Sequence, residues 1–368
     1  MSDNWVQVME EGAASYDLPA GLTEADLKQM YEGMIMIRAY DERALKLQRS
    51  GRIGFCVTSF GEEATQVGTA HALRPDDWVF PAYRQYGVPL YRGASMTKMA
   101  AHLFGNADDS AKGRQMPAHY TFDEHRFVSA SSVIGSQIIH AVGCAMAIKY
   151  RKSDEVAVTY FGDGASSAND FHSSLNFAGV YKPPVLFFLV NNQYAISLPV
   201  EKQTGISELY KKAEGYGVHG IRVDGNDVIA VYKATREAAQ RARDGKGATL
   251  LELFTYRVGA HSSSDDPTRY REKDETAEWK EKDPIERMKR YLQQLNIWTE
   301  EYEAEVWEQC RTKLSVAITK AEQIGDPPWE SAFENVYAEM PSALEAQKQE
   351  LLDRESGLEL NNEGEFPL

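Results

Sequence analysis

Two hydrophobic patterns divide the chain. Between about residues 60 and 260, short runs rich in Val, Ile, Leu and Phe alternate with stretches whose apolar residues recur every three or four positions. The short runs predict strands and the longer stretches predict helices. Their alternation is typical of an α/β domain with an open parallel sheet and helices on both faces. The expected strands are residues 78–80, 127–130, 156–161, 185–190, 220–223 and 250–256.

Helical periodicity also extends beyond this region. Residues 22–49 begin with a capping pattern, Thr23 and Asp26, and predict an N-terminal helix. After residue 261 a polar loop leads to charge-rich helices around 283–295 and 301–323, a turn at 325–329 and a final helix. We therefore expect an N-terminal helical arm at 1–50, an α/β domain at 51–270 and an acidic helical C-terminal extension for subunit assembly at 271–368. Inside the domain, the expected helices are 62–73, 95–104, 137–149, 168–178 and 227–243.

Charge separates the same regions. The 368 residues include 40 Lys+Arg and 55 Asp+Glu, for a net charge of −15. The first 260 residues hold 27 basic and 29 acidic side chains, whereas the remainder holds 13 and 26. An acidic chain repels phosphate backbones and anionic lipids, so we expect neither a nucleic-acid partner nor membrane binding. The near-neutral part is the better place for a site that binds anions.

Targeting signals and cysteine patterns favour a cytoplasmic protein. The N-terminus lacks the basic start and apolar stretch of a secretory signal, and the longest apolar run, residues 185–190, is far too short to cross a bilayer. Cys56, Cys144 and Cys310 are widely separated and form no C-x-x-C pair. They predict neither a disulfide framework nor a thiolate metal site.

Candidate chemistry follows two successive strands. The strand at 156–161 leads into Gly162, Asp163 and Gly164, and the strand at 185–190 ends at Asn191 and Asn192. Ligands of open parallel sheets bind beyond the carboxyl ends of the strands, and a glycine-rich turn at a helix N-terminus can receive an anion. A lone Gly-Asp-Gly is more often a tight turn. The asparagine pair beyond the next strand instead favours Mg²⁺ bound to a diphosphate, because Mg²⁺ prefers carboxylate and amide oxygens.

This arrangement resembles the thiamin diphosphate fingerprint. From about residue 25 to residue 345 the chain is similar to alpha subunits of the decarboxylating component of 2-oxo acid dehydrogenase complexes, most closely to branched-chain members. It departs from the animal branched-chain enzymes at Val190, Ala82 and Ala260, where they have arginine, glutamine and histidine. Further matching segments are residues 47–53, 61–63, 113–117, 222–228, 255–259, 261–266, 269–271 and 339–341.

The resemblance implies a thiamin diphosphate-binding fold of the diphosphate-binding type, with thiamin diphosphate and Mg²⁺ as cofactors. It assigns Asp163, the Asn192 side chain and the Tyr194 carbonyl to the metal. Tyr83 and Arg84 match the family's tyrosine-arginine pair on the distal phosphate. Arginine suits phosphate because its planar fork donates two hydrogen bonds, although an isolated Tyr-Arg pair is more often a surface feature. The residues implied around the cofactor are Tyr83, Arg84, Ser132, Ile134, Gly162, Asp163, Gly164, Ala165, Asn192, Tyr194, Ala195, Ile196 and His261.

His261 is the implied catalytic residue, because an imidazole after a strand end can orient substrate or move protons near neutral pH. Arg257 and Asp266 are expected to pair and hold its loop. Taken alone, a histidine is more often structural, and Ile134 and Phe55 would be read as core residues. The implied substrate contacts are Phe55, Arg84, Met116, His119 and Ser132.

The resemblance also implies partners, because the sequence has room for only one α/β domain. The carboxylic acid that assists the cofactor would come from a beta subunit in an α2β2 heterotetramer. The expected function is 3-methyl-2-oxobutanoate dehydrogenase, which decarboxylates a small branched 2-oxo acid and transfers the acyl group to the lipoyl domain of the acyltransferase component. The alternatives are a pyruvate or acetoin dehydrogenase subunit, or a subunit that has lost catalysis and acts as a structural or regulatory partner.

Overall fold

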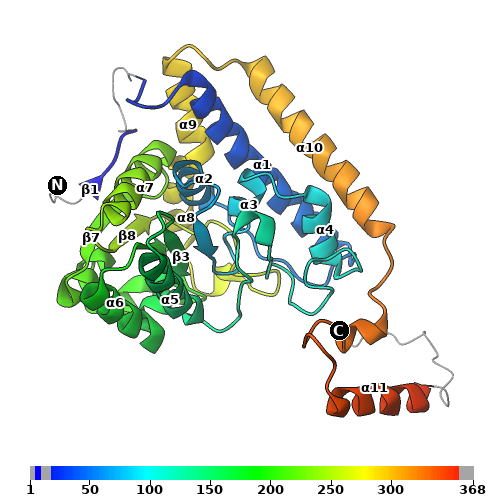
Figure 1. The fold of residues 1–368 in the computed structure, drawn as a ribbon. Coiled ribbons are helices and arrows are strands. Elements are labelled where there is room, and N and C mark those ends of the chain that lie inside the picture. Colours follow the sequence, from blue (N-terminus) through cyan, green and yellow to red (C-terminus); the bar gives the residue numbers. More distant parts are fainter. Residues whose placement is uncertain (1–4, 10–17, 356–368) are drawn as a thin grey trace.

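The sheet is parallel throughout and has six strands (Figure 1). The structure, a computed structural model, describes residues 5–9 and 18–355. Strand order across the sheet is β1-β7-β8-β4-β3-β2, and a separate antiparallel hairpin joins β5 (Tyr194–Ala195) to β6 (Leu198–Pro199). The strands of the sheet are β1 (Trp5–Val6), β2 (Trp78–Phe80), β3 (Ala157–Gly162), β4 (Val185–Asn191), β7 (His219–Asp224) and β8 (Thr249–Phe254).

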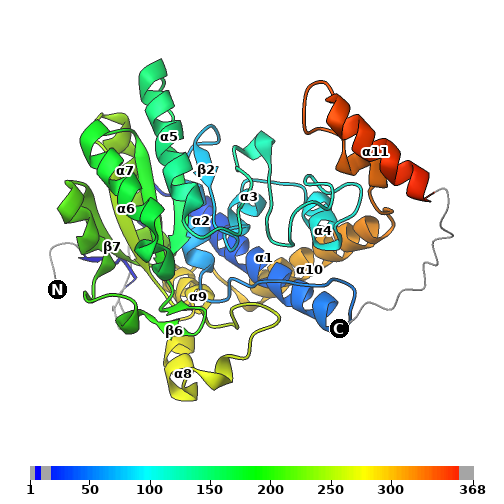
Figure 2. The ribbon, with the colours of Figure 1, turned by 90° about the horizontal axis from the view of Figure 1, so that it is seen from below.

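Helices cover both faces of this sheet, as the sequence predicts (Figure 2). On β4, Leu186 and Phe188 point into one apolar cluster, whereas Phe187 and Leu189 point into another. Both sets are buried because successive side chains of a strand face opposite sides. The first cluster includes α2 (Glu63–Ala72) and α7 (Val228–Arg243); the second includes α5 (Ser136–Arg151), α6 (Asn169–Tyr181) and the 3₁₀ segment η4 (Leu209–Tyr216).

A close helix contact depends on one glycine. A Cβ built at Gly68 of α2 would lie 2.7 Å from the Val228 carbonyl oxygen and 2.8 Å from the Val231 side chain, both on α7. No side chain fits that space. Gly68 therefore allows α2 and α7 to pack together on one face of the sheet.

The helix α1 (Glu24–Arg49) has the expected capping box, in which Asp26 N–H donates to Thr23 Oγ1 and Thr23 N–H donates to Asp26 Oδ2. Its buried face shares the first apolar cluster with the helices near the C-terminal end, α9 (Pro284–Gln294) and α10 (Glu300–Glu322). The ribbon of α10 runs beside α1 in both views (Figures 1 and 2). The remaining helices are α3 (Gly87–Tyr91), α4 (Met96–Phe104), α8 (Lys273–Glu281) and α11 (Ser342–Glu355).

The prediction of a strand at residues 127–130 is wrong. Phe127 forms only isolated bridges, and the segment contacts β2 through two bonds, Val79 N–H to the Arg126 carbonyl at 2.8 Å and Val128 N–H to the Val79 carbonyl at 2.9 Å. Pairing stops because β2 has three residues and is followed by Pro81, which has no N–H to donate. The sequence also does not predict β1, the β5–β6 hairpin, α3 and α8, because these elements are short or have only a weak hydrophobic pattern.

Within residues 5–9 and 18–355, no helix combines the length and the apolar character needed to cross a membrane.

The Asp77 side chain links the sheet to its flanking helices through hydrogen bonds. Its buried carboxylate accepts hydrogen bonds from Arg74 N–H at 2.8 Å, from Val156 N–H at 2.9 Å and from the Arg243 guanidinium at 2.6 Å. Asp77→Ala should lower the free energy of unfolding by about 3–5 kcal/mol, because it leaves a largely buried cation and two amides without their acceptor. The matched control, Asp76→Ala, removes an exposed ion pair with Arg74 and should change it by less than about 1 kcal/mol. Equal losses in urea unfolding of the two variants would contradict this role.

Candidate active site

A cavity of about 600 Å³ opens where β2, β3, β4 and β8 end. Each strand is followed by a segment that contributes to its lining, as expected for an open parallel sheet. The sixteen residues that the sequence analysis assigned to cofactor, metal or substrate all line this one cavity, although their roles stay predictions. They are Phe55, Tyr83, Arg84, Met116, His119, Ser132, Ile134, Gly162, Asp163, Gly164, Ala165, Asn192, Tyr194, Ala195, Ile196 and His261.

The two glycines of the turn after β3 differ in their surroundings. A Cβ at Gly162 would meet no atom within 4 Å, so this position faces open space. A Cβ at Gly164 would lie 2.8 Å from the Ala195 Cβ of the hairpin, which is closer than side chains approach. Glycine at 164 is therefore needed for the turn and the hairpin to meet. Residues Asp163–Ser167 form a 3₁₀ segment, and α6 begins at Asn169, one residue from the predicted start at residue 168.

Asp163 places a buried carboxylate in the cavity. Its Oδ2 accepts a hydrogen bond from Gln203 Nε2 at 2.6 Å, and it makes no ion pair with any residue that the structure describes. Burial raises the pKa of the Asp163 carboxyl, and the hydrogen bond from Gln203 partly offsets that effect. A divalent cation would stabilise the charged form. Gln203 could not be predicted, because it lies in a polar segment with no distinctive pattern.

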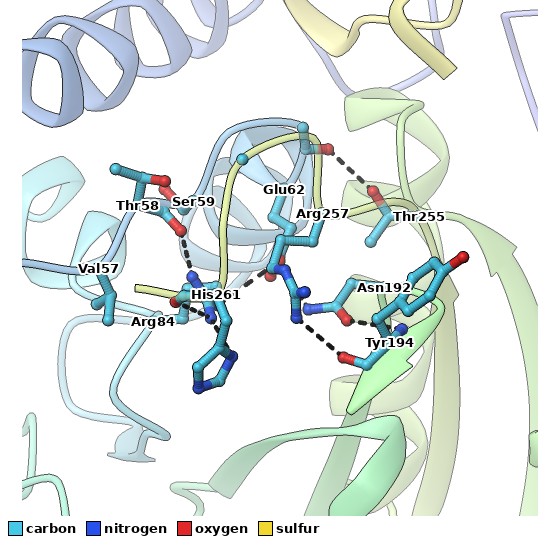
Figure 3. Close-up of polar contacts among 12 residues, drawn as sticks. Val57, Thr58, Ser59, Glu62, Arg84, Asn192, Tyr194, Thr255, Arg257 and His261 are labelled. Carbon is cyan, nitrogen blue, oxygen red and sulfur yellow. Dashed lines mark hydrogen bonds and ion pairs between the residues drawn. The ribbon is translucent and has the colours of Figure 1, made fainter. Parts of the chain in front are cut away.

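Asn192 is held by a second buried carboxylate, that of Glu62. The Asn192 Nδ2 donates to Glu62 Oε1 at 2.8 Å, which turns Oδ1 to the opposite side of the amide, at 3.5 Å from the Tyr194 N–H (Figure 3). The neighbouring Tyr194 carbonyl accepts from Arg257 Nη1 at 3.1 Å. From the sequence, Glu62 stands out only as part of a matching segment, because a glutamate at a helix start is ordinarily exposed.

Arg84 joins two of the segments around the cavity. Its guanidinium donates to the Thr58 carbonyl and, at 3.0 Å, to the His261 carbonyl, while its Nε lies 3.8 Å from Glu62 Oε1 (Figure 3). Burial lowers the pKa of Arg84, but the nearby Glu62 carboxylate and neighbouring tyrosines outweigh burial and leave it raised. The residue therefore presents a permanent positive charge to the cavity.

His261 is neutral at physiological pH. Burial is the main cause, and the charges of Arg84 and Arg257 add to it, so that the pKa of His261 falls to about 4. Its ring meets the Tyr83 ring edge-on, with centroids 6.0 Å apart. The backbone N–H of His261 donates to Asp265 Oδ2 at 2.7 Å, which fixes the loop.

The expected pairing of Arg257 with Asp266 is wrong. Arg257 donates to the Tyr194 carbonyl, to the Ile196 carbonyl at 2.6 Å and to the Tyr270 hydroxyl at 3.0 Å. Asp266 instead caps a short 3₁₀ turn by accepting from Thr268 N–H at 3.1 Å. A carboxylate at a turn start is held by the local amides, so it does not reach the guanidinium.

One wall of the cavity is open to solvent. Met116 is 51% exposed, Ile134 53% and Ile196 55%, although all three line the cavity. Beside them, Ser132 Oγ and His119 Nε2 are 2.8 Å apart, and burial lowers the pKa of His119. The mouth therefore combines apolar side chains with one polar pair.

The surroundings of His261 give a pH prediction. Because its folded pKa is lowered, the imidazole should stay neutral as the pH falls from 8 to about 5 and take up a proton only near pH 4. Arg84→Gln should raise this midpoint toward the ordinary value of about 6.5, since it removes one repelling charge. NMR titration of the His261 ring in both proteins measures the two midpoints. A midpoint near 6.5 in the unsubstituted chain would refute the proposed electrostatics.

Comparison with known proteins agrees with this geometry. The model of the family described as "Dehydrogenase E1 component" matches residues 31–330. The mitochondrial 2-oxoisovalerate dehydrogenase subunit alpha of Caenorhabditis elegans is 44% identical over 325 residues, covering 88% of this chain and 75% of the relative. The mouse protein of the same name is 41% identical over 331 residues, covering 90% of this chain and 75% of the relative. The pyruvate dehydrogenase E1 component subunit alpha of Staphylococcus aureus (strain Mu50) is 40% identical over 354 residues, covering 95% of this chain and 93% of the relative.

The family model covers most of the chain, and each of these relatives is at least 40% identical along most of its own length. The resemblance found in the sequence is thereby confirmed at the level of the family. The chain belongs to the dehydrogenase E1 component family.

Proposed function

We propose that this chain is the alpha subunit of a branched-chain 2-oxo acid dehydrogenase, 3-methyl-2-oxobutanoate dehydrogenase, and binds thiamin diphosphate and Mg²⁺ in the cavity. The observation that carries the proposal is the Asp163 carboxylate, which is buried in the cavity wall without an ion pair to a described residue. Burying a carboxylate is costly unless it is paired or coordinates a metal.

The donor groups fit the proposed cofactors. The Asp163 carboxylate, the Asn192 Oδ1 and the Tyr194 carbonyl are hard oxygen ligands of the kind Mg²⁺ takes, with phosphate oxygens and water completing the octahedron. The open space at Gly162 leaves room for a phosphate beside the backbone, and Arg84 supplies charge from the opposite segment. Val190 is buried within β4 and its side chain has no polar group, so this position adds no charge to the cavity.

Thiamin diphosphate, when bound, stabilises the negative charge that develops on decarboxylation. The chain's own residues bind the anionic groups and orient the oxo acid. Arg84 attracts the anionic groups, while the neutral His261 can donate a hydrogen bond from one ring nitrogen and accept one at the other, and so orient the oxo acid. Phe55 and the His119–Ser132 pair lie on the same cavity lining and would contact the substrate.

A beta subunit would complete the site. The described residues form one six-stranded sheet and one short hairpin, and the half-exposed Met116, Ile134 and Ile196 leave an apolar wall that a second chain would cover. We propose an α2β2 assembly in which the partner supplies the carboxylic acid, and in which the acyl product passes to the lipoyl domain of the acyltransferase component. The three cysteines are free, which fits a cytoplasmic location.

The substrate assignment has one close competitor. Phe55 on the cavity lining and the two 2-oxoisovalerate dehydrogenase relatives support a branched substrate. The pyruvate dehydrogenase relative, matched over 93% of its length, favours pyruvate as the second candidate.

The metal assignment is tested with Asp163→Ala. In the chain co-purified with its beta subunit, this variant should lose Mg²⁺-dependent binding of thiamin diphosphate by more than about 100-fold, because removing a ligand costs more than removing the groups behind it. Decarboxylation of the oxo acid should fall accordingly. The control, Asp170→Ala, removes a carboxylate at the first turn of α6 that does not line the cavity, and should bind the cofactor normally. Calorimetry with and without Mg²⁺ measures both; unchanged affinity in Asp163→Ala would refute the assignment.

The substrate assignment is tested by comparing kcat/KM for 3-methyl-2-oxobutanoate and pyruvate in the reconstituted complex. A pocket shaped for the branched chain should favour the first by about 10-fold or more, since one methylene is worth about 1–3 kcal/mol. Phe55→Ala should reduce kcat/KM for the branched substrate more than for pyruvate. A preference for pyruvate in the unsubstituted enzyme would overturn the branched-chain assignment and leave the family assignment intact.

A further inference from the structure

Glu62 is a buried carboxylate that does not line the cavity but lies directly behind two groups that do. It is the N-cap residue of α2, yet its side chain makes no capping hydrogen bond. It points toward Arg84 and Asn192 instead (Figure 3). Its Oε2 has no hydrogen-bond partner among the described residues, so this carboxylate is costly to bury and calls for an explanation.

The first consequence of Glu62 is the orientation of an amide. A side-chain amide can present either its oxygen or its NH₂ to the cavity, and a carboxylate can only accept. By accepting from Asn192 Nδ2 at 2.8 Å, Glu62 selects the orientation in which Oδ1 lies on the other side. The reversed amide would point two N–H donors at a cation and repel it.

The second consequence is charge balance. The Nε of Arg84 lies 3.8 Å from Glu62 Oε1, and Arg257 lines the same cavity. The two guanidinium groups repel one another, and Glu62 is close enough to attract both. Removing its charge should make the cavity more positive and therefore more attractive to a free anion.

We propose that Glu62 is a positioning residue, which orients the Asn192 amide so that its oxygen meets the divalent cation and moderates the positive charge that Arg84 and Arg257 present to the cavity. This inference rests on the proposed function, because it presupposes a cation beside Asp163 and Asn192. It extends that proposal to a group that touches neither the cofactor nor the substrate.

A positioning role and a merely structural role predict different changes in ligand affinity when Glu62 is replaced. If Glu62 only stabilises the fold, its loss should weaken every ligand of the cavity together. If it positions Asn192 and balances the arginines, its loss should weaken the metal and leave the free anion bound equally or more tightly. Opposite changes in two affinities do not arise from general loosening of the site.

The experiment uses the chain co-purified with its beta subunit and two probes. They are Mn²⁺, measured by EPR in the presence of inorganic pyrophosphate, and pyrophosphate alone, measured by calorimetry without metal. Glu62→Ala should bind Mn²⁺ about 10–100-fold more weakly, as expected for loss of a group behind a metal ligand. Its affinity for metal-free pyrophosphate should stay the same or increase. Glu62→Gln keeps an acceptor for Asn192 and loses the charge, so it should retain more of the Mn²⁺ affinity and also bind pyrophosphate more tightly.

A reversed pair gives a rescue. Glu62→Gln combined with Asn192→Asp places the amide at position 62, behind the cavity lining, and the carboxylate at position 192, on the lining. This exchange preserves the hydrogen bond between the two side chains and keeps an oxygen facing the cation. This double variant should bind Mn²⁺ at least as tightly as the unsubstituted chain. Asn192→Asp alone sets two carboxylates face to face and should not benefit in the same way.

Glu63→Gln is the matched control, because Glu63 is equally buried on the same helix but pairs with Arg38, away from the cavity. It should lower the melting temperature and leave both affinities unchanged. The inference is overturned if Glu62→Ala, or Glu62→Gln should the alanine variant not fold, leaves Mn²⁺ and pyrophosphate affinities unchanged or lowers both in parallel. If the unsubstituted chain binds neither probe, or Asp163→Ala binds Mn²⁺ as well as it does, the proposed function itself fails.

Discussion

Buried guanidinium groups hold the loops of this protein together where its strands end. Beyond a strand end the backbone carbonyls lose their sheet partners, and each must find another donor. Arg84 bonds the carbonyls of Thr58 and His261, while Arg257 bonds those of Tyr194 and Ile196. Arg271 continues the series with the carbonyls of Arg257 and Gly259. Arginine is suited to this because one side chain carries five donors in a planar fork, so a few residues hold loops from several strands.

These bonds also determine the electrostatics of the cavity. Arg84 and Arg257 are held near His261 by their bonds to carbonyls, and their charges add to the effect of burial, which is the main cause of the lowered pKa of His261. The carboxylate of Asp163 lines the cavity directly after β3, and that of Glu62 lies behind the lining at the start of α2. The cavity thus alternates fixed positive and negative groups over a short distance, which suits a ligand that is itself a cation bound to an anion.

Most of the fold could be predicted from the sequence because β3, β4 and β8 are mostly apolar and almost entirely buried, since they lie inside the sheet and not at its edges. Site residues that directly follow these strands, such as Asp163 and Asn192, could be placed for the same reason. Edge elements could not: residues 127–130 have strand-like composition but only a three-residue partner in β2. Pairings across the site, such as that of Asn192 with Glu62, join residues 130 positions apart in the sequence and leave no local pattern.

The contact between Gly164 and Ala195 has a consequence for how this site can vary. With 2.8 Å between the Ala195 Cβ and the place where a Cβ of residue 164 would lie, the two positions form a single steric unit. Residue 164 cannot gain a side chain unless the turn after β3 and the β5–β6 hairpin move apart, which would separate Asp163 from Tyr194. Substitutions in the two segments are therefore not independent, and an insertion in the hairpin would act on the turn as directly as a mutation within it.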